Sequence, residues 1–233
     1  MNKEREQIIQ KLMHEPGMTF NQLWDHIGAS NKFAYHLGVL EEDGLVEKSH
    51  EGYQLTQAGK KYVAYVEGAT GKKSSAPLFC AIIVLEKDGK VLLNQRTKEP
   101  FYGFWAFPAG KMKMHQYILE TAADELKEET GLACDLELKG LQSIKTYHEG
   151  EIAYNHQLFV VRGLNPTGTL LESTREGKNQ WVAIEEIKDL KTFPNIFQSI
   201  EIALGKHFRW IETERLQEND KFKDVKVLKD VQL

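Results

Sequence analysis

The chain has 233 residues, of which 41% are hydrophobic, and a formal net charge of −4 at pH 7. This length suits one large domain or two smaller ones, and the composition is that of a soluble globular protein with a buried core. No run approaches the roughly 18 apolar residues of a membrane span, and the start lacks a secretory signal, so we expect a cytoplasmic protein. The negative charge excludes a chain that is basic throughout, so any nucleic-acid binding must be local.

Before residue 68 the chain shows helical patterns followed by a short strand pattern. Apolar residues recur at helical spacing in the first helix, and the Pro-Gly pair at 16–17 ends it. Thr19 is expected to cap a second helix and Ser30 a third. The segment LVEKSHEGYQLT is typical of two short strands. The predicted helices are Glu4–His14, Thr19–Gly28, Ser30–Asp43 and Ala58–Val66.

This order of elements resembles the winged helix-turn-helix family, particularly its ArsR-like and MarR-like transcription regulators. The most specific stretch is Ser30–Val46, SNKFAYHLGVLEEDGLV, which resembles the family's recognition helix and the turn into its wing. The resemblance implies that this helix enters the major groove of duplex DNA. The implied DNA contacts are Ser30, Asn31, Lys32, Tyr35 and His36.

The charge of this segment opposes DNA binding. Residues 1–68 contain seven Lys or Arg and ten Asp or Glu, which gives a net charge of −3. Phosphate contacts supply most of the non-specific affinity for DNA, so a net acidic module binds weakly unless its cations cluster or a dimer doubles them. A winged helix used for dimerisation or protein contact is therefore the alternative.

The stretch EGATGKKSSAP at 67–77 has almost no apolar residues, which is typical of a linker. It divides the chain into two predicted domains. We predict a winged helix-turn-helix domain at 1–68, a linker at 69–76 and a second domain at 77–206. The C-terminal extension at 207–233 has no role that the sequence indicates.

After the linker the pattern changes to strands. LFCAIIVLEKDGKVLLNQR predicts a buried strand, a turn at Asp88-Gly89 and a second strand that ends at Arg96. An aromatic cluster that includes Trp105 follows in a loop; such rings usually join the core, although one or two could stack on a base. Cys80 and Cys134 lie in apolar contexts, which favours reduced core thiols over a disulfide or a metal site.

The strongest helical pattern runs from 117 to 130, and Gly131 stands where such a helix ends. Glu125, Glu128 and Glu129 are spaced by three and four residues, so they project from one face. Like charges at this spacing cost roughly 0.2 to 0.5 kcal/mol per pair. A solvated acidic face is one explanation. The other is a bound hard cation such as Mg²⁺, which bridges carboxylates and phosphates.

The spacing of these residues favours the cation. GKMKMHQYILETAADELKEETGL, from Gly110 to Leu132, resembles the Nudix box. The resemblance implies a Nudix α/β/α sandwich with a mixed sheet, and Mg²⁺- or Mn²⁺-dependent hydrolysis of a nucleotide pyrophosphate by an activated water. The implied metal ligands are the Ala109 carbonyl and the carboxylates of Glu125, Glu128 and Glu129, and these glutamates are also the implied catalytic residues.

The resemblance extends to substrate-binding residues and to a further ligand. Arg96 and Lys111 are candidates to face phosphate, and Trp105 is a candidate to stack on a base, although surface and core roles remain open for all three. Many family members take another glutamate from a later loop, and here Glu172 and Glu176 are the candidates.

The box departs from the family pattern at two positions. Gln116 stands where the first Glu belongs, and Asp124 stands where the Arg belongs. In the family that Arg is expected to orient the neighbouring glutamate, here Glu125. Replacing it with an acid removes this partner and adds repulsion, which puts catalysis in doubt more than metal binding.

These observations predict an α+β protein, a winged helix-turn-helix domain joined to a Nudix sandwich. The expected function is hydrolysis of a nucleoside diphosphate linked to another moiety. The alternative is a transcription regulator whose Nudix domain senses a nucleotide without cleaving it. A homodimer suits either function.

Overall fold

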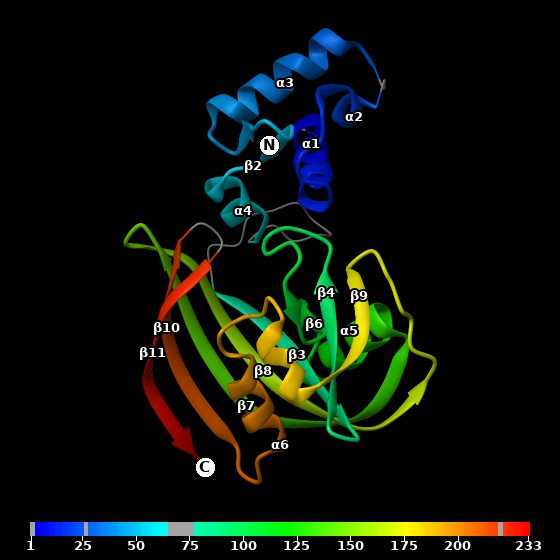
Figure 1. Cartoon of the computed structure of the whole chain (residues 1–233), viewed down its shortest axis with the longest axis vertical. Helices are drawn as coiled ribbons and strands as arrows, with labels where there is room; N and C mark the ends of the chain where they lie inside the picture. Colours follow the sequence, from blue (N-terminus) through cyan, green and yellow to red (C-terminus); the bar gives the residue numbers. More distant parts are fainter. Residues whose placement is uncertain (1–2, 26–27, 65–76, 219–220) are drawn as a thin grey trace. The chain divides into compact units, whose positions relative to one another are not determined.

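The computed structural model describes residues 3–25, 28–64, 77–218 and 221–233. The chain divides into two compact units: Met1–Ser75 with Thr97–Tyr102, the N-terminal unit, and Ala76–Arg96 with Gly103–Leu233, the C-terminal unit. Figure 1 labels their helices and strands. The predicted linker at 69–76 lies outside the described residues. Among the residues that are described, no helix has the length and apolarity needed to cross a membrane.

In its described part, the N-terminal unit combines helices with one antiparallel pair of strands (Figure 1). Leu12, Leu37 and Leu40 from two of the helices are buried in one core with Val46 and Leu55 from the strands. Burial of these side chains is the main stabilising term for such a small unit. The elements are α1 (Lys3–His14), α2 (Phe20–Trp24), α3 (Ser30–Glu42), β1 (Val46–Lys48), β2 (Tyr53–Leu55) and α4 (Gln57–Ala64).

The helix boundaries in this unit agree with the predicted ones in part. Thr19 caps α2 as predicted, and its side chain forms a capping box with Gln22. The same helix ends at Trp24 rather than near Gly28, because Asp25 adopts a left-handed conformation with φ of 55°. The predicted capping role of Ser30 is wrong: Ser30 is the first helical residue of α3, and Ala29 occupies the cap without a side-chain bond.

The C-terminal unit is built on one large mixed sheet (Figure 1). Its strands lie in the order β11-β10-β7-β8-β3-β4-β5, with β6 paired to β3 and β9 paired to β4. The strands are β3 (Leu78–Lys87), β4 (Lys90–Arg96), β5 (Trp105–Ala106), β6 (Ala109–Lys111), β7 (Leu132–His148), β8 (Glu151–Gly168), β9 (Gly177–Ala183), β10 (Arg209–Glu218) and β11 (Lys221–Gln232). The helices are α5 (Ile118–Thr130), η1 (Ile184–Asp189) and α6 (Ile196–Leu204).

Helices cover the two faces of this sheet. Side chains alternate along a strand, and Ala81 and Ile83 of β3 pack in a core with Leu126 of α5. Ile82 of β3 packs in a second core with Ile200 of α6. The continuous apolar run in the sequence of β3 therefore reflects burial on both faces. We call the two faces the α5 face and the α6 face.

The C-terminal extension, to which the sequence assigned no structure, joins the sheet. β10 pairs in parallel with β7, and β11 returns antiparallel to β10. Along β10 the buried positions are Ile211, Thr213, Arg215 and Gln217. Since Ile211 belongs to the core beneath α6, these alternating side chains point to the α6 face.

Candidate active site

The loop before α5 brings the box glycine against a box glutamate. A Cβ atom placed on Gly110 would lie 1.9 Å from Cγ and 2.0 Å from Cδ of Glu125. The glycine is therefore required here because the glutamate side chain crosses directly over its Cα. β6 pairs with β3 at Gly110 and Ala81, so this contact fixes Glu125 relative to the sheet.

The second box glutamate with a defined position is Glu129. Its side chain is buried, and Oε2 accepts a hydrogen bond of 3.1 Å from the backbone N–H of Ala109. A buried carboxylate is costly unless hydrogen bonds or positive charge stabilise it. Glu128, one residue earlier in the sequence, is exposed. Gly131, in the left-handed conformation, ends α5 directly after this acidic turn, as the sequence predicts.

Two asparagines that the sequence did not single out hold the end of α5. Asn179 Nδ2 donates to the backbone carbonyls of Glu129, at 2.6 Å, and Leu171, at 2.8 Å. Asn94 Nδ2 donates to Asn179 Oδ1 at 2.9 Å. Both asparagines are buried, and together they tie β4 and β9 to the acidic turn of the helix. Sequence gave no signal for this pair beyond two polar residues within strand patterns.

The two positions that depart from the box contact each other. Gln116 Nε2 donates a hydrogen bond of 2.6 Å to Asp124 Oδ2. We expected Asp124 to repel Glu125 and to leave it without a partner to orient it. In the structure the Asp124 carboxylate is bound by Gln116, and Glu125 is positioned by its contact over Gly110. Gln116 stands where the family pattern has Glu, and Asp124 stands where it has Arg. The hydrogen bond between these two residues links the loop before α5 to the helix itself.

The donor set at this turn suits a hard divalent cation. Within the described residues, no three His, Cys, Asp or Glu side chains already converge closely enough to hold a metal ion. Glu125 and Glu129 both contact the strand at 109–110, and the three box glutamates share one helix face. Carboxylate and carbonyl oxygens are the ligands that Mg²⁺ prefers, and it retains several waters. The residues present fit such an ion.

Two predicted phosphate-binding cations lie near Glu125. Lys111 of β6 lies opposite Cys80 of β3, and Arg96 ends β4. Burial raises the pKa of the Cys80 thiol to about 11; Lys111 and Arg96 oppose this rise, and Glu125 adds to it. All three charged groups therefore act on one thiol, which places them around the start of β3. Cys80 is a free, buried cysteine, as predicted.

The remaining candidates are less well placed. Trp105 is partly buried and packs against the core beneath α6, so much of its ring is committed to packing. Glu172 is exposed, and its backbone carbonyl accepts from Asn179 N–H. Glu176 pairs with Arg175 at 3.2 Å.

A row of polar side chains on the α6 face lies beside these cations. Tyr154, which is fully buried, stacks on His156 at 6.0 Å between ring centroids. Burial, as the largest cause, and the positive charges of Arg215, Lys111 and Arg96 together lower the pKa of His156 to about 3. His156 is therefore neutral at pH 7. Neither Tyr154 nor His156 belongs to a motif that marks it as functional in the sequence.

We expect His156 to make the C-terminal unit sensitive to acid. The unfolded chain binds a proton near pH 6.5 and the folded chain only near pH 3, so stability falls as the pH decreases between these values. By pH 4 the loss reaches up to about 3 kcal/mol of unfolding free energy. Urea denaturation of His156→Gln at pH 7 and pH 4 should show a smaller acid effect than the parent. The exposed His207→Gln is the control, and an equal acid effect in all three proteins would contradict this assignment.

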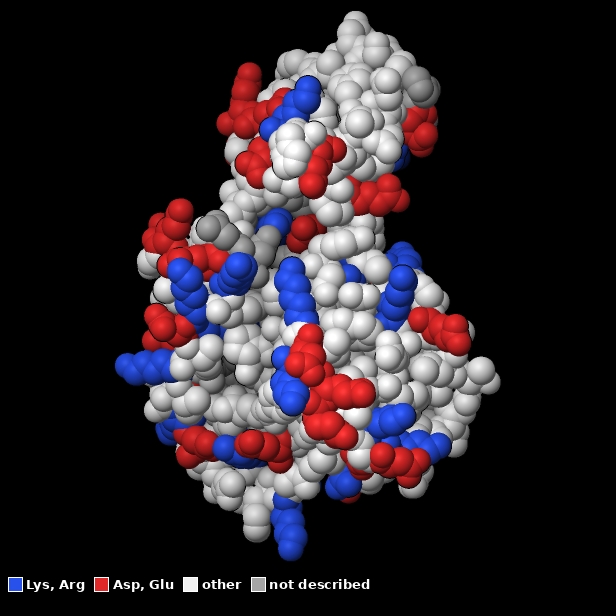
Figure 2. Space-filling view, in the orientation of Figure 1, with Lys and Arg blue, Asp and Glu red and all other residues white. Residues whose placement is uncertain are grey.

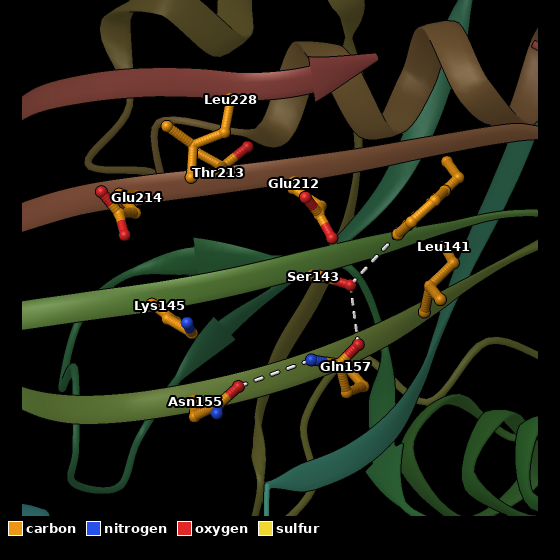
Figure 3. Close-up of a pocket in the computed structure, with 10 residues that line it drawn as sticks. Leu141, Ser143, Lys145, Asn155, Gln157, Glu212, Thr213, Glu214 and Leu228 are labelled. Carbon is orange, nitrogen blue, oxygen red and sulfur yellow. Dashed lines mark hydrogen bonds between the residues drawn. The ribbon is translucent and has the colours of Figure 1, made fainter. Parts of the chain in front are cut away.

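A groove of about 370 Å³ lies on the α5 face, away from the box residues, across β7, β8, β10 and β11 (Figure 3). Its polar side chains bond to one another: Ser143 Oγ donates to Gln157 Oε1 at 2.7 Å, and Gln157 Nε2 donates to Asn155 Oδ1 at 3.4 Å. The Lys229 ammonium lies 4.5 Å from the centroid of the Trp210 ring. These hydrogen bonds link Ser143, Gln157 and Asn155 to one another across β7 and β8.

In the N-terminal unit, four of the five predicted DNA contacts are accessible. Tyr35 is 63% exposed, and Ser30, Asn31 and Lys32 are also exposed on α3. The prediction for His36 is wrong, because its side chain is only 5% exposed and points into the unit. Lys32 is already paired with Glu4 of α1. On the face visible in Figure 2, acidic and basic side chains of this unit are mixed and form no continuous basic patch.

Comparison with known proteins supports the assignment of the box. The NUDIX domain family matches residues 76–201, and a domain of unknown function (DUF7347) matches residues 1–66. An uncharacterized Nudix hydrolase, YvcI, of Bacillus subtilis is 31% identical over 112 residues, which cover 48% of this chain and 69% of that protein. An ADP-ribose pyrophosphatase of Methanocaldococcus jannaschii is 28% identical over 127 residues, or 54% of this chain and 70% of that protein.

Two further proteins are similar to this chain, one in sequence and one in structure. The human 8-oxo-dGDP phosphatase NUDT18 is 31% identical over 105 residues, which cover 45% of this chain and 30% of that protein. The crystal structure of the MutT protein from Bacillus halodurans has a TM-score of 0.56 and 25% identity, and covers 65% of this chain and 97% of that one. The chain belongs to the Nudix hydrolase family. Within that family it is a Nudix-type pyrophosphohydrolase.

Proposed function

We propose that this protein hydrolyses the pyrophosphate of a nucleoside diphosphate linked to another moiety, with Mg²⁺ or Mn²⁺ as cofactor. The observation that carries the proposal is the acidic turn of α5, where Glu125 crosses Gly110 and Glu129 is held by the Ala109 N–H. The names of two relatives, an ADP-ribose pyrophosphatase and an 8-oxo-dGDP phosphatase, support a substrate with a nucleoside diphosphate part.

In this proposal the metal ligands are Glu125, Glu128, Glu129 and the Ala109 carbonyl. When bound, the ion supplies Lewis acidity and lowers the pKa of a coordinated water. Arg96 and Lys111 neutralise phosphate charge from the start of β3, the region in which both act on the Cys80 thiol. One box glutamate serves as the base that accepts a proton from the attacking water.

The test of this function uses the purified full-length chain. Nucleotide sugars, ADP-ribose, dinucleoside polyphosphates and nucleoside triphosphates are screened by thermal shift with and without Mg²⁺, and products are then measured for the best ligands. We expect metal-dependent release of a nucleoside monophosphate from a diphosphate-linked substrate. Tight binding without product from any ligand would overturn hydrolysis and favour a nucleotide sensor.

A second function, DNA binding by the N-terminal unit, is favoured by one observation. The order α1, α2, α3 followed by the β1-β2 pair is the order that led us to expect a winged helix-turn-helix, and the start of α3 is exposed. In this proposal Ser30, Asn31, Lys32 and Tyr35 contact DNA, and the protein couples nucleotide binding or hydrolysis to transcription, as a homodimer. A dimer would double the few cations available to phosphate.

The pairing of Lys32 with Glu4 gives a sharp prediction for DNA binding. The hydrogen bond from Lys32 lowers the pKa of the Glu4 carboxyl, so Glu4 competes with phosphate for this lysine. Lys32→Ala should weaken binding to all sequences and reduce the salt slope by about one. Glu4→Gln should strengthen binding, because it releases the lysine. Fluorescence anisotropy at several salt concentrations measures both variants; no binding by any of the three proteins at low salt would favour a protein-contact role.

A further inference from the structure

The C-terminal hairpin, β10 with β11, forms part of the groove on the α5 face (Figure 3). β10 contributes Trp210, Glu212 and Glu214 to the lining, and β11 contributes Leu228. These strands lie beyond the stretch that matches the Nudix domain family, residues 76–201. The groove therefore includes side chains from outside the matched domain.

The sheet register gives the groove an apolar side and a polar side. Directly opposed side chains on neighbouring strands point to the same face. The opposed pairs, from β7 to β10, are Leu141 with Trp210, Ser143 with Glu212, and Lys145 with Glu214. The first pair is apolar and the other two are polar or charged. A ligand in the groove would therefore meet apolar and hydrogen-bonding groups side by side.

A β-bulge directs one more apolar side chain into the groove. Glu212 pairs with Lys229 and Thr213 pairs with Val227, so Leu228 falls between the two pairs. A bulged residue leaves the regular alternation of the strand, which re-aims its side chain. Leu228 lines the groove and is 50% exposed. It therefore offers apolar surface to a ligand.

Two charged groups of the groove have no partner within the part of the chain that the structure describes. There, no side chain forms an ion pair or a hydrogen bond with the Glu212 carboxylate or with the Lys145 ammonium. Glu214, by contrast, accepts a hydrogen bond of 3.0 Å from the Tyr147 hydroxyl. Glu212 is partly buried, and a carboxylate withdrawn from water gains free energy when a donor reaches it.

These charges favour a neutral ligand with hydroxyl groups. Each carboxylate of the groove lies opposite a lysine, Glu212 opposite Lys229 and Glu214 opposite Lys145, so neither an anion nor a cation gains net attraction. A carboxylate only accepts hydrogen bonds and an ammonium only donates them, whereas a hydroxyl does both. A sugar ring has hydroxyls at its rim and C–H groups on its faces, which suit the charged side and the Trp210 side respectively.

We propose that this groove binds a sugar, with its hydroxyls bonded to Glu212 and Lys145 and its ring against Trp210. The volume of about 370 Å³ falls in the range of small-molecule sites, about 300 to 1,000 Å³. Two sources would supply the sugar: a free saccharide, or the sugar of a nucleoside diphosphate sugar. The second source rests on the proposed function, because it places the diphosphate at the box residues.

The second source is within reach because the groove and the box glycine share one face of the sheet. Gly110 of β6 lies opposite Ala81 of β3, which packs in the core beneath α5. In the order β6-β3-β8, two spacings or roughly 10 Å separate the strand of Gly110 from β8. Phe79 of β3 is 44% exposed and lies opposite Gln157 of the groove. A sugar linked to a diphosphate at the box can therefore cross Phe79 into the groove.

The test measures binding to the full-length protein by calorimetry and saturation-transfer NMR. The free probes are glucose, galactose, mannose and ribose. The linked probes are UDP-glucose, UDP-galactose, GDP-mannose and ADP-ribose, each compared with its nucleoside diphosphate alone. We expect at least one sugar to bind, either free or as a gain in affinity over the nucleoside diphosphate.

Glu212→Gln should reduce this sugar affinity by roughly 10-fold or more, because hydrogen bonds to a charged group are lost. Lys145→Met should reduce it as well, and this exposed side chain can be replaced without loss of a described contact. Glu218→Gln is the matched control, since Glu218 lies on the same strand but is paired with Lys223 and does not line the groove.

Binding of a free sugar that depends on Glu212 assigns the groove to saccharides. A gain seen only with the linked probes, and lost in Glu212→Gln, assigns it to the sugar of the substrate. Either result supports the inference even if no probe is hydrolysed, in which case only the proposed function fails. No sugar binding by any probe, or sugar affinity unchanged in both groove variants, would overturn the inference and leave the hydrolysis untouched.

Discussion

Glu129→Gln is expected to lower kcat for pyrophosphate hydrolysis by about 10² to 10⁴, the usual contribution of a positioned acid or base. Glutamine keeps the size of the side chain and an oxygen that can accept from the Ala109 N–H, a contact of 3.1 Å in the structure. What it removes is negative charge at a buried position on the metal-binding face. We therefore also expect a severe loss of Mg²⁺ affinity with little loss of folding.

Steady-state kinetics over a range of Mg²⁺ concentrations, with calorimetry of metal binding, measures both effects. Glu120→Gln is the matched control: it lies on the same helix, in the first turn, where it accepts from the Tyr117 N–H. Glutamine performs the same capping role as glutamate, so this variant should keep full activity. If Glu129→Gln keeps parental kcat and metal affinity, the acidic turn is only a solvated face.

Gly110→Ala should reduce activity by at least about 10² although it adds a single methyl group. The new Cβ would lie 1.9 Å from Glu125 Cγ, so either the glutamate leaves its position or β6 and α5 separate. A displaced catalytic group loses most of the advantage of a positioned one. The backbone of Gly110 does not have a positive φ, so alanine causes no conformational strain of its own.

Gly38→Ala is the control for this glycine, because nothing lies within 4 Å of a Cβ placed there and φ is not positive. In α3 this change should leave activity unchanged and stabilise the helix by up to about 1 kcal/mol. Thermal denaturation and kcat are measured for both variants. Parental kcat in Gly110→Ala would show that Glu125 takes no part in catalysis.

Local patterns in the sequence predicted the elements that carry the chemistry. Helix α5, Ile118–Thr130, agrees to within one residue with the predicted range 117–130, because its apolar residues keep helical spacing. The hairpin turn at Asp88-Gly89 forms as predicted, and both residues have positive φ. The box spacing also located the acidic face of α5 and the glycine that Glu125 crosses. These features depend on residues close in sequence.

Features that depend on residues far apart in the sequence could not be predicted from local patterns. Along β10 the buried positions include Thr213, Arg215 and Gln217, so the usual alternation of apolar and polar residues is hidden. The Asn94–Asn179 bond joins residues 85 positions apart, and no local pattern indicates it. His36 lies on the buried side of α3 because the packing of the unit, not the helix sequence alone, decides which side is covered.

The position of β10 in the sheet has a consequence for how the protein is made. β7 gains its second neighbour only from β10, which emerges from the ribosome after every other partner of β7. Ribosomes add about 5 to 20 residues per second, so several seconds pass between the synthesis of β7 and that of β10. During this time one edge of β7 is unpaired. Open edges recruit strands from other chains. Newly made chains are therefore most vulnerable to aggregation in this interval, and a fragment that stops at residue 206 would remain in that condition permanently.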